Sequence, residues 1–232
     1  MRTGTLSLLM LLLASFVPIK AAAAAGPHVI TLGKWTTVPW SSESRSPGLD
    51  ESKPPTLKIR ALMVDGRIKE YILGAPHEVT DRLFVARRVF RINDSLPGEA
   101  NPRWLWQRGG WLLVDRVSGK ISALNLPEFD ALYSAASWYR DYVAYCGVAD
   151  DGKKYAIVAQ VSRRKPVVKK LLAGDVIPED AAPDSACVPP AWQRNPVQVS
   201  FQPPGATKQT YAVRGHIVDV VVDDEEDVEA SK

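Results

Sequence analysis

Tryptophan and arginine side chains gather in one stretch of the chain in a pattern typical of a ligand-binding surface. Exposed indole rings stack on sugar rings or peptides, and guanidinium groups bind anions or aromatic faces. Because strand side chains alternate between two faces, Trp104 and Trp106 would share one face of a strand. The same rings, if buried, would be part of a β-sheet core. Our candidate ligand-binding residues are Trp104, Trp106, Arg108, Trp138 and Arg140.

Groups for acid–base or metal chemistry are sparse. The chain has 3 histidines, His28, His77 and His216, and lacks zinc-binding and nucleophile-elbow motifs. Asp81 and Asp141 are candidates for the two carboxyl groups of a glycoside hydrolase, which would have to lie about 5–10 Å apart. The sequence predicts no catalytic residue, metal ligand or cofactor.

The chain contains 2 cysteines, Cys146 and Cys187. Outside the cytoplasm such a pair most simply forms one disulfide. Closing a loop of about 40 residues would stabilise the fold by about 4 kcal/mol. Two free thiols are the alternative. We predict a disulfide between Cys146 and Cys187, which would tie a proline-rich stretch at 178–190 to a strand.

The N-terminal segment has the three parts of a secretory signal peptide. Arg2 is followed by the apolar run Leu6–Ile19 and by the small residues Ala21–Ala25. The apolar run, about 14 residues, is short for a bilayer span. A retained N-terminal anchor is the alternative. We expect the protein to be exported, periplasmic or extracellular, without a transmembrane span in the mature chain.

Short strands separated by turns are predicted from residue 57 onward. Asp65-Gly66, between the apolar-rich segments Leu57–Val64 and Arg67–Leu73, is a strong hairpin signal because both turn residues tolerate positive φ. The best helix candidate, Glu128–Ala136, is short. With 18 prolines and 15 glycines, the sequence predicts an all-β fold, an antiparallel meander of short strands.

Several features recur at regular intervals, and Phe84, Trp138 and Trp192 are evenly spaced. A period of about 50–54 residues, with several strands per unit, is typical of β-propeller blades. Within Trp111–Leu172, WLLVDRVSGKISALNL and CGVADDGKKYAIVAQ are similar to the "VD…SGK" hairpin and the "DGK" turn of TolB-like and WD40-like propellers. This resemblance implies three to four propeller-like blades. A β-sandwich with a regular hairpin rhythm is the alternative.

Charge and composition divide the chain into four segments. We expect a signal peptide over 1–25, an N-terminal strand and a mobile Pro/Ser loop over 26–56, a single all-β domain over 57–222, and an acidic disordered tail over 223–232. The net charge is +3. Without Arg2 and Lys20, a body of charge +6 is offset by a tail of charge −5. Anionic partners suit such a body.

The sequence therefore predicts an exported, non-enzymatic, β-rich protein that binds a ligand or another protein in the cell envelope. We expect the partner to be an envelope protein or an acidic polysaccharide. Nucleic acid is not expected as a partner, because the chain is exported. Two alternatives stay open. One is a secreted carbohydrate-active hydrolase, and the other is a structural accessory protein.

Overall fold

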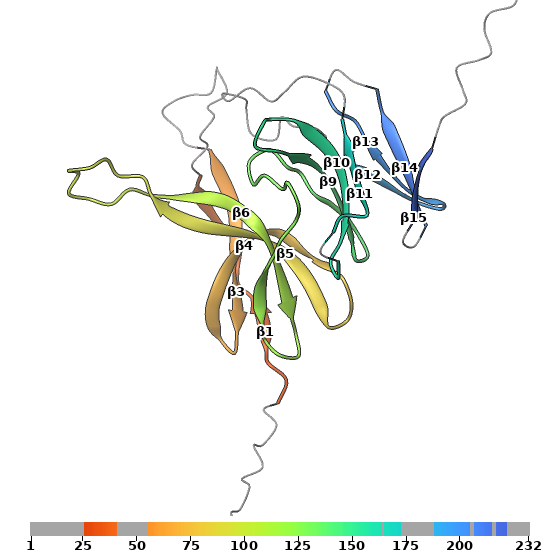
Figure 1. The fold of residues 1–232 in the computed structure, drawn as a ribbon. Coiled ribbons are helices and arrows are strands. Elements are labelled where there is room, and N and C mark those ends of the chain that lie inside the picture. The colour runs from red at the N-terminus through yellow and green to blue at the C-terminus, as the bar shows by residue number, and fades with distance from the viewer. Residues whose placement is uncertain are drawn as a thin grey trace, which may run out of the picture.

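A computed structural model describes residues 26–40, 55–163, 165–172, 188–204, 207–214 and 217–221 of the 232-residue chain. These residues contain strands and turns and no helix. Their strands form three antiparallel sheets (Figure 1). The predicted all-β antiparallel meander is confirmed.

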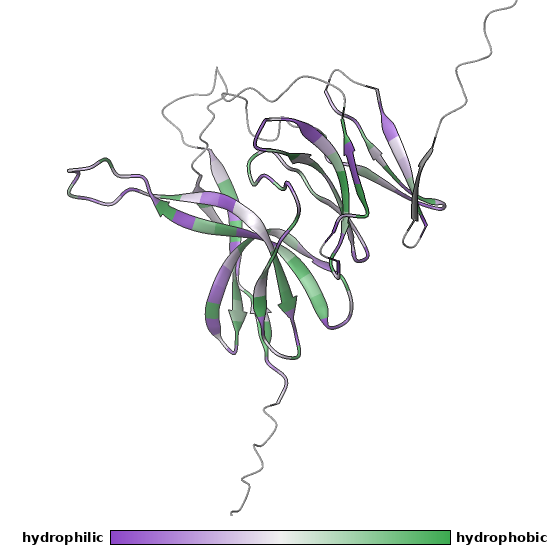
Figure 2. Cartoon of the chain, viewed as in Figure 1, coloured by the Kyte–Doolittle hydropathy of each residue, from purple (hydrophilic) through white to green (hydrophobic). Residues whose placement is uncertain are grey.

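Sheet A is seven-stranded, with the order β1-β3-β4-β5-β6-β7 and with β2 paired to the other end of β3. Hydrophobic and hydrophilic residues alternate along its strands (Figure 2). The Asp65-Gly66 turn joins β3 to β4 with both φ angles positive, as predicted. The strands are β1 (Ile30–Leu32), β2 (Thr36–Pro39), β3 (Thr56–Val64), β4 (Arg67–Glu78), β5 (Leu83–Asn93), β6 (Trp104–Asp115) and β7 (Ile121–Leu124).

Sheet A buries opposite faces at its two ends. Ile72 packs with Phe84 and Leu112 in one core cluster, near β1 and β7. Its sequence neighbour Tyr71 points to the opposite face and packs in a second cluster with Ile59. Register shifts in β3–β4, β4–β5 and β5–β6 accompany this change of face, because bulges bend and twist a strand.

The two ends of sheet A also curl toward themselves. His28, just before β1, lies against the β6–β7 turn, where a Cβ on Gly119 would stand 2.7 Å from the His28 ring. At the other end, an isolated parallel bridge between Trp40 and Trp106 brings the chain after β2 onto β6. Each end thereby encloses its own core cluster.

Two four-stranded meanders follow. Ala144 and Val158 of sheet B pack with Phe201 and Tyr211 of sheet C in one core cluster. Sheet B is apolar on both faces, since Tyr145 and Ile157 are buried in a further cluster on its other side. Sheet B comprises β8 (Ser137–Tyr139), β9 (Tyr142–Val148), β10 (Lys154–Gln160) and β11 (Val168–Leu171), and sheet C comprises β12 (Ala191–Arg194), β13 (Val197–Phe201), β14 (Gln209–Arg214) and β15 (Ile217–Val221).

Trp138 and Trp192 occupy equivalent positions, each as the second residue of the first strand of a four-stranded sheet. The ring of Trp138 contacts Trp111 of sheet A, and the ring of Trp192 stacks on Tyr139 of sheet B. Phe84 instead packs in the core of its own sheet. The described sheets are open, and the choice between propeller-like blades and a sandwich stays a prediction.

The outward face of sheet C carries a pair of hydroxyl groups. Phe201 and Tyr211 point toward sheet B. Ser200 and Thr210 belong to the opposite face, because side chains alternate along a strand, and their hydroxyl oxygens are 2.9 Å apart in a hydrogen bond. Sheet C thus has hydroxyl groups on its outward face, whereas sheet B has apolar clusters on both faces.

The best helix candidate in the sequence, Glu128–Ala136, does not form a helix. Glu128 has a φ of 51°, outside the helical region. The carboxylate of Asp130 accepts hydrogen bonds from the backbone N–H groups of Leu132 and Tyr133, at 2.7 and 2.9 Å. These are the contacts of a helix N-cap, and the Ser134 N–H donates to the Asp130 carbonyl at 2.9 Å, so a single turn begins here. The turn is not continued, and the Ser134 hydroxyl donates to the carbonyl of Cys146 in β9 at 2.7 Å. The segment therefore forms turns that cover one face of sheet B, through Phe129 and Ala136.

Candidate functional site

The structure places the five predicted binding residues in two regions. Trp104, Trp106 and Arg108 are on β6 of sheet A. Trp138 is on β8, and Arg140 is in the turn that follows it. The two regions differ in exposure and in what the side chains contact.

Trp106 and Arg108 support the upper end of sheet A, where β2 meets β6. The Trp106 ring meets Tyr71 edge to face, with ring centroids 4.9 Å apart. The guanidinium of Arg108 lies over the Trp40 ring, 4.3 Å from its centroid. Both side chains are half-buried. Their contacts are those of a structural core rather than of an open binding surface.

Trp138 and Arg140 join sheet B to sheet A. Trp138 stacks on His77 of β4 at 5.5 Å and meets Trp111 of β6 at 5.0 Å. The Nε2 of His77 donates a hydrogen bond to the backbone carbonyl of Arg140 at 2.7 Å, because a carbonyl oxygen can only accept. Arg140 adopts a φ of 53° at this turn. These residues therefore position the two sheets.

Arg87 is a further member of this junction that sequence reasoning missed. It is 9 % exposed. Its guanidinium lies 4.8 Å from the centroid of the Phe129 ring and donates a hydrogen bond to the carbonyl of Ala131 at 2.7 Å. Arg87 thus ties β5 to the turns that cover sheet B. No sequence motif marks it, because these partners belong to a distant part of the chain.

Trp104 belongs to a different feature, which we call the hairpin arm and define as residues 90–105. The arm is the end of the β5–β6 hairpin, and it projects away from the three sheets at the left of Figure 1. It carries three exposed apolar side chains: Phe90 is 36 % exposed, Trp104 44 % and Leu96 65 %. The guanidinium of Arg91 lies over the Trp104 ring at 4.4 Å.

The tip of the hairpin arm is held by its own hydrogen bonds. The side-chain oxygen of Asn93 accepts hydrogen bonds from the Ser95 hydroxyl at 2.7 Å and from the Arg103 N–H at 3.1 Å. Arg103 also pairs with Asp94 at 3.1 Å. The carboxylate of Glu99 accepts a hydrogen bond from the Leu96 N–H at 3.0 Å. This network holds the loop in one shape, with Leu96 facing solvent.

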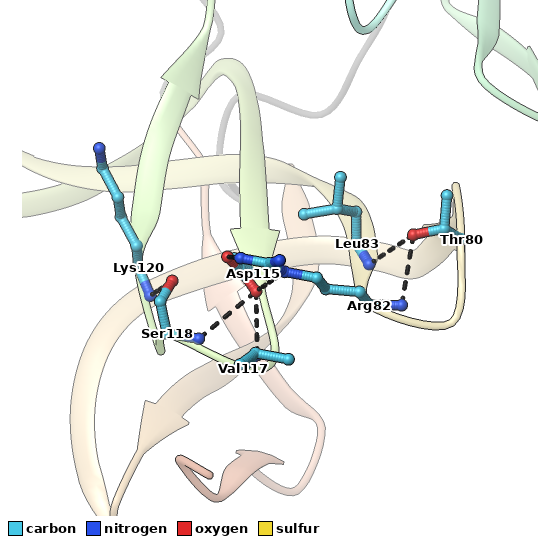
Figure 3. Close-up of polar contacts among 7 residues, drawn as sticks. All are labelled: Thr80, Arg82, Leu83, Asp115, Val117, Ser118 and Lys120. Atoms are coloured by element: carbon cyan, nitrogen blue, oxygen red, sulfur yellow. Dashed lines mark hydrogen bonds and ion pairs between the residues drawn. The ribbon is translucent and has the colours of Figure 1, made fainter. Parts of the chain in front are cut away.

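Carboxylates at the far end of sheet A are bound to arginines. Asp115 accepts hydrogen bonds from Arg82 Nε at 2.8 Å and from the Val117 N–H at 2.9 Å (Figure 3). The Arg82 hydrogen bond holds the pKa of Asp115 well below its usual range. Glu78 pairs with both terminal nitrogens of Arg116, which lowers the pKa of Glu78. These contacts fasten the β4–β5 turn to the β6–β7 turn.

The two carboxylates considered for a hydrolase lie in separate turns. Asp81 is in the β4–β5 turn, and Asp141 is in the β8–β9 turn. The side-chain amide of Gln160 donates a hydrogen bond to Asp141. Within the described ranges, no group of three or more His, Cys, Asp and Glu side chains is placed to hold a metal ion.

Several predictions fall on residues that the structure does not describe. Cys146 is buried in β9, but Cys187 is outside the described residues, so the disulfide stays a prediction. The signal peptide at 1–25, the loop at 41–54, His216 and the acidic tail at 223–232 are outside them too. In the part of the chain that is described, no helix is long and apolar enough to cross a membrane.

Comparisons with known proteins add no relative. No family model matches the chain, and no curated protein or solved structure matches it. The resemblance to propeller blades therefore rests on its short motifs alone. Function has to be argued from the exposed groups of this chain.

Proposed function

We propose that this chain is an exported, non-enzymatic binding protein that contacts another protein of the cell envelope through the hairpin arm. The observation that carries the proposal is the exposure of Leu96 and Trp104, 65 % and 44 %, on a projecting hairpin with an internally bonded tip. Export is supported by the signal-peptide pattern at the N-terminus.

The residue types on the arm are those that dominate protein–protein binding energy. Tryptophan and arginine are enriched among the few interface residues that carry most of the affinity. On the arm, Arg91 covers one side of the Trp104 ring at 4.4 Å and leaves the rest of it exposed. The pair offers a partner both an apolar surface and a positive charge.

The order of the tip favours binding over a merely solvated loop. Association costs about 0.5–1.5 kcal/mol for each flexible side chain that it immobilises, and ordering a loop adds to this cost. The hydrogen bonds of Asn93, Arg103 and Glu99 already hold the tip in one shape. A partner with an apolar pocket for Leu96 would therefore bind the arm without first having to order it.

Site-specific photo-crosslinking in the source cells tests the proposal. A photoreactive phenylalanine analogue is placed at Leu96 or at Trp104, and a control is placed at Val117, which is 55 % exposed in the β6–β7 turn. We expect the same discrete protein adduct from both arm positions and not from position 117. The proposal is wrong if no adduct forms at the arm, or if position 117 gives the same adduct.

A charge substitution separates binding from folding. Leu96→Asp is expected to abolish the adduct formed from position 104 while the protein keeps its melting temperature, because Leu96 makes few contacts with the rest of the fold. Val117→Asp is the matched control and should leave the adduct unchanged.

A further inference from the structure

A second strongly exposed tryptophan, Trp35, borders a groove on sheet A that no residue of the hairpin arm lines. The groove has a volume of about 460 Å³ and is lined by Trp35, Thr37, Lys58, Leu73 and Gly74. Its volume is in the range of small-molecule sites, about 300–1,000 Å³. The segment joining β1 to β2 runs beside β3, because both strands pair with β3, and the groove is lined by this segment together with residues of β3 and β4.

The groove is built on the outward face of the upper end of sheet A. Leu57 and Ile59 point into the core of this end. Because strand side chains alternate, Lys58 and Arg60 point outward. Trp35 is 50 % exposed, and the Arg60 guanidinium lies over its ring at 4.4 Å. The Trp35 ring therefore lies against the Arg60 guanidinium, and Lys58 lines the same groove.

Gly74 leaves room in the groove. It has a φ of +72°, and no atom lies within 4 Å of the place that a Cβ would occupy. This glycine falls within the stretch of β4, between Leu73 and His77, where the register with β5 shifts. The wall opposite Trp35 therefore includes the bare backbone of Gly74 rather than a bulky side chain.

The charges around the groove have one sign. Among the described residues that line it, Lys58 is charged and none is acidic. No ion pair within the described part of the chain involves Lys58. The Nε of Arg60 is buried and has no hydrogen-bond partner there. Glu70, the acid nearest along β4, pairs with Arg88 at 2.9 Å.

We infer that this groove binds an acidic sugar ring, a pyranose that carries a carboxylate. The C–H face of a pyranose is apolar and suits stacking on the exposed side of Trp35. A carboxylate on that ring would form charge-assisted hydrogen bonds with Lys58 or Arg60. The groove is open to solvent, so it admits a ring inside a polysaccharide as well as a free sugar. This site is separate from the hairpin arm and does not depend on the proposed protein contact.

Calorimetric titration of the purified full chain tests the inference with four probes: oligogalacturonate, free galacturonate, neutral galactan and citrate. We expect oligogalacturonate to bind and neutral galactan to bind at least about tenfold more weakly, with affinity falling as salt rises. Binding of free galacturonate as well would place the recognition in a single ring, and binding of the oligomer alone would place it in the polysaccharide. Galactan binding as tightly as oligogalacturonate, or citrate binding as tightly, would overturn the inference.

Two matched pairs of variants locate the site. Trp35→Ala is expected to weaken oligogalacturonate binding by about tenfold, whereas Trp104→Ala, which removes another exposed and arginine-covered indole, should leave it unchanged. Lys58→Gln is expected to weaken binding by about fivefold, and Lys69→Gln should not. Melting curves confirm that each variant is folded. Equal losses in Trp35→Ala and Trp104→Ala would refute the assignment to this groove.

Discussion

The indole Nε1 of Trp192 donates a hydrogen bond to the backbone carbonyl of Ser137, 3.0 Å away. The bond connects the first strand of sheet C to the first strand of sheet B. Next to it, the Trp192 ring stacks on Tyr139 with centroids 5.5 Å apart. Trp192 therefore links two sheets through one polar and one aromatic contact, which substitutions can separate.

We predict that Trp192→Phe lowers the free energy of unfolding by about 1 kcal/mol, because the Ser137 carbonyl loses its donor while the ring contact is kept. Trp192→Ala removes both contacts and should cost about 3 kcal/mol. Urea denaturation of the two variants measures the difference. Equal losses would contradict the role given to the hydrogen bond.

Two glycines on neighbouring sheets should differ in how much stability the fold loses when a methyl group is added. A Cβ on Gly147 would clash with Ile157 Cδ1 and would stand 3.1 Å from the carbonyl oxygen of Glu128. Ile157 is fully buried, so Gly147→Ala should cost about 2 kcal/mol through overpacking. Gly110→Ala is the control and should change stability by less than about 0.5 kcal/mol, because no atom lies within 4 Å of its Cβ position. Thermal denaturation of both variants measures the two stability changes, and equal changes would contradict the prediction.

Because Asp115 is bound to Arg82, we expect the free energy of unfolding to decrease as the pH falls into the acid range. It lowers the pKa of Asp115 in the folded state, so the unfolded chain takes up the proton first as the pH falls. The stabilisation is fully present above the unfolded pKa, about 3.9, and is lost as the pH falls through the lowered pKa. Asp115→Asn should be less stable at neutral pH and should show a flatter loss of stability in acid. Arg82→Gln should change stability in the same direction but by less, because the Val117 and Ser118 N–H groups still bind Asp115, and the double variant should add little to Asp115→Asn, as urea denaturation across the pH range would show.

Because Tyr145 is buried, we expect the free energy of unfolding to decrease at alkaline pH. Its hydroxyl donates a hydrogen bond to the carbonyl of Pro127 at 2.7 Å, and burial raises the pKa of Tyr145 well above its usual range. The stabilisation of the neutral form is therefore present below the unfolded pKa, about 10, and is lost as the pH rises through the raised pKa. In ultraviolet titration of the folded proteins, wild type and Tyr145→Phe should show the same number of ionising tyrosines. In denaturant the wild type should show one more, and a difference already in the folded state would contradict the prediction.

Local signals predicted the strands and turns well. The hairpin at Asp65-Gly66 needs positive φ at both residues, and aspartate and glycine supply it without outside help. The helix candidate at Glu128–Ala136 shows the limit of local signals, because Asp130 caps a single turn as it would cap a helix. The segment is instead held against sheet B, where the Ser134 hydroxyl donates to the Cys146 carbonyl, and the residue propensities do not reveal these distant contacts.

The candidate site was harder to predict, because exposure depends on residues distant in the sequence. Trp104 and Trp106 are on one strand, as expected from the sequence. Tyr71 covers Trp106, however, whereas Trp104 lies farther along the strand on the arm and is exposed. The groove at Trp35 gives no sequence signal, since its cations are on a strand that comes well after it in the chain. Spacing along the chain predicted which residues share a face, and not which faces are covered.

The unequal faces of sheets B and C determine where the chain could be lengthened. A further unit of the sheet B type, apolar on both sides, would fit as an insertion between the two existing sheets. The same unit joined after sheet C would press an apolar face onto the Ser200 and Thr210 hydroxyls. Their mutual hydrogen bond uses one of their two O–H donors, and burying the other donor without a partner is costly. Enlargement of this fold is therefore directional, because new units are favoured between sheets B and C and disfavoured on the outward face of sheet C.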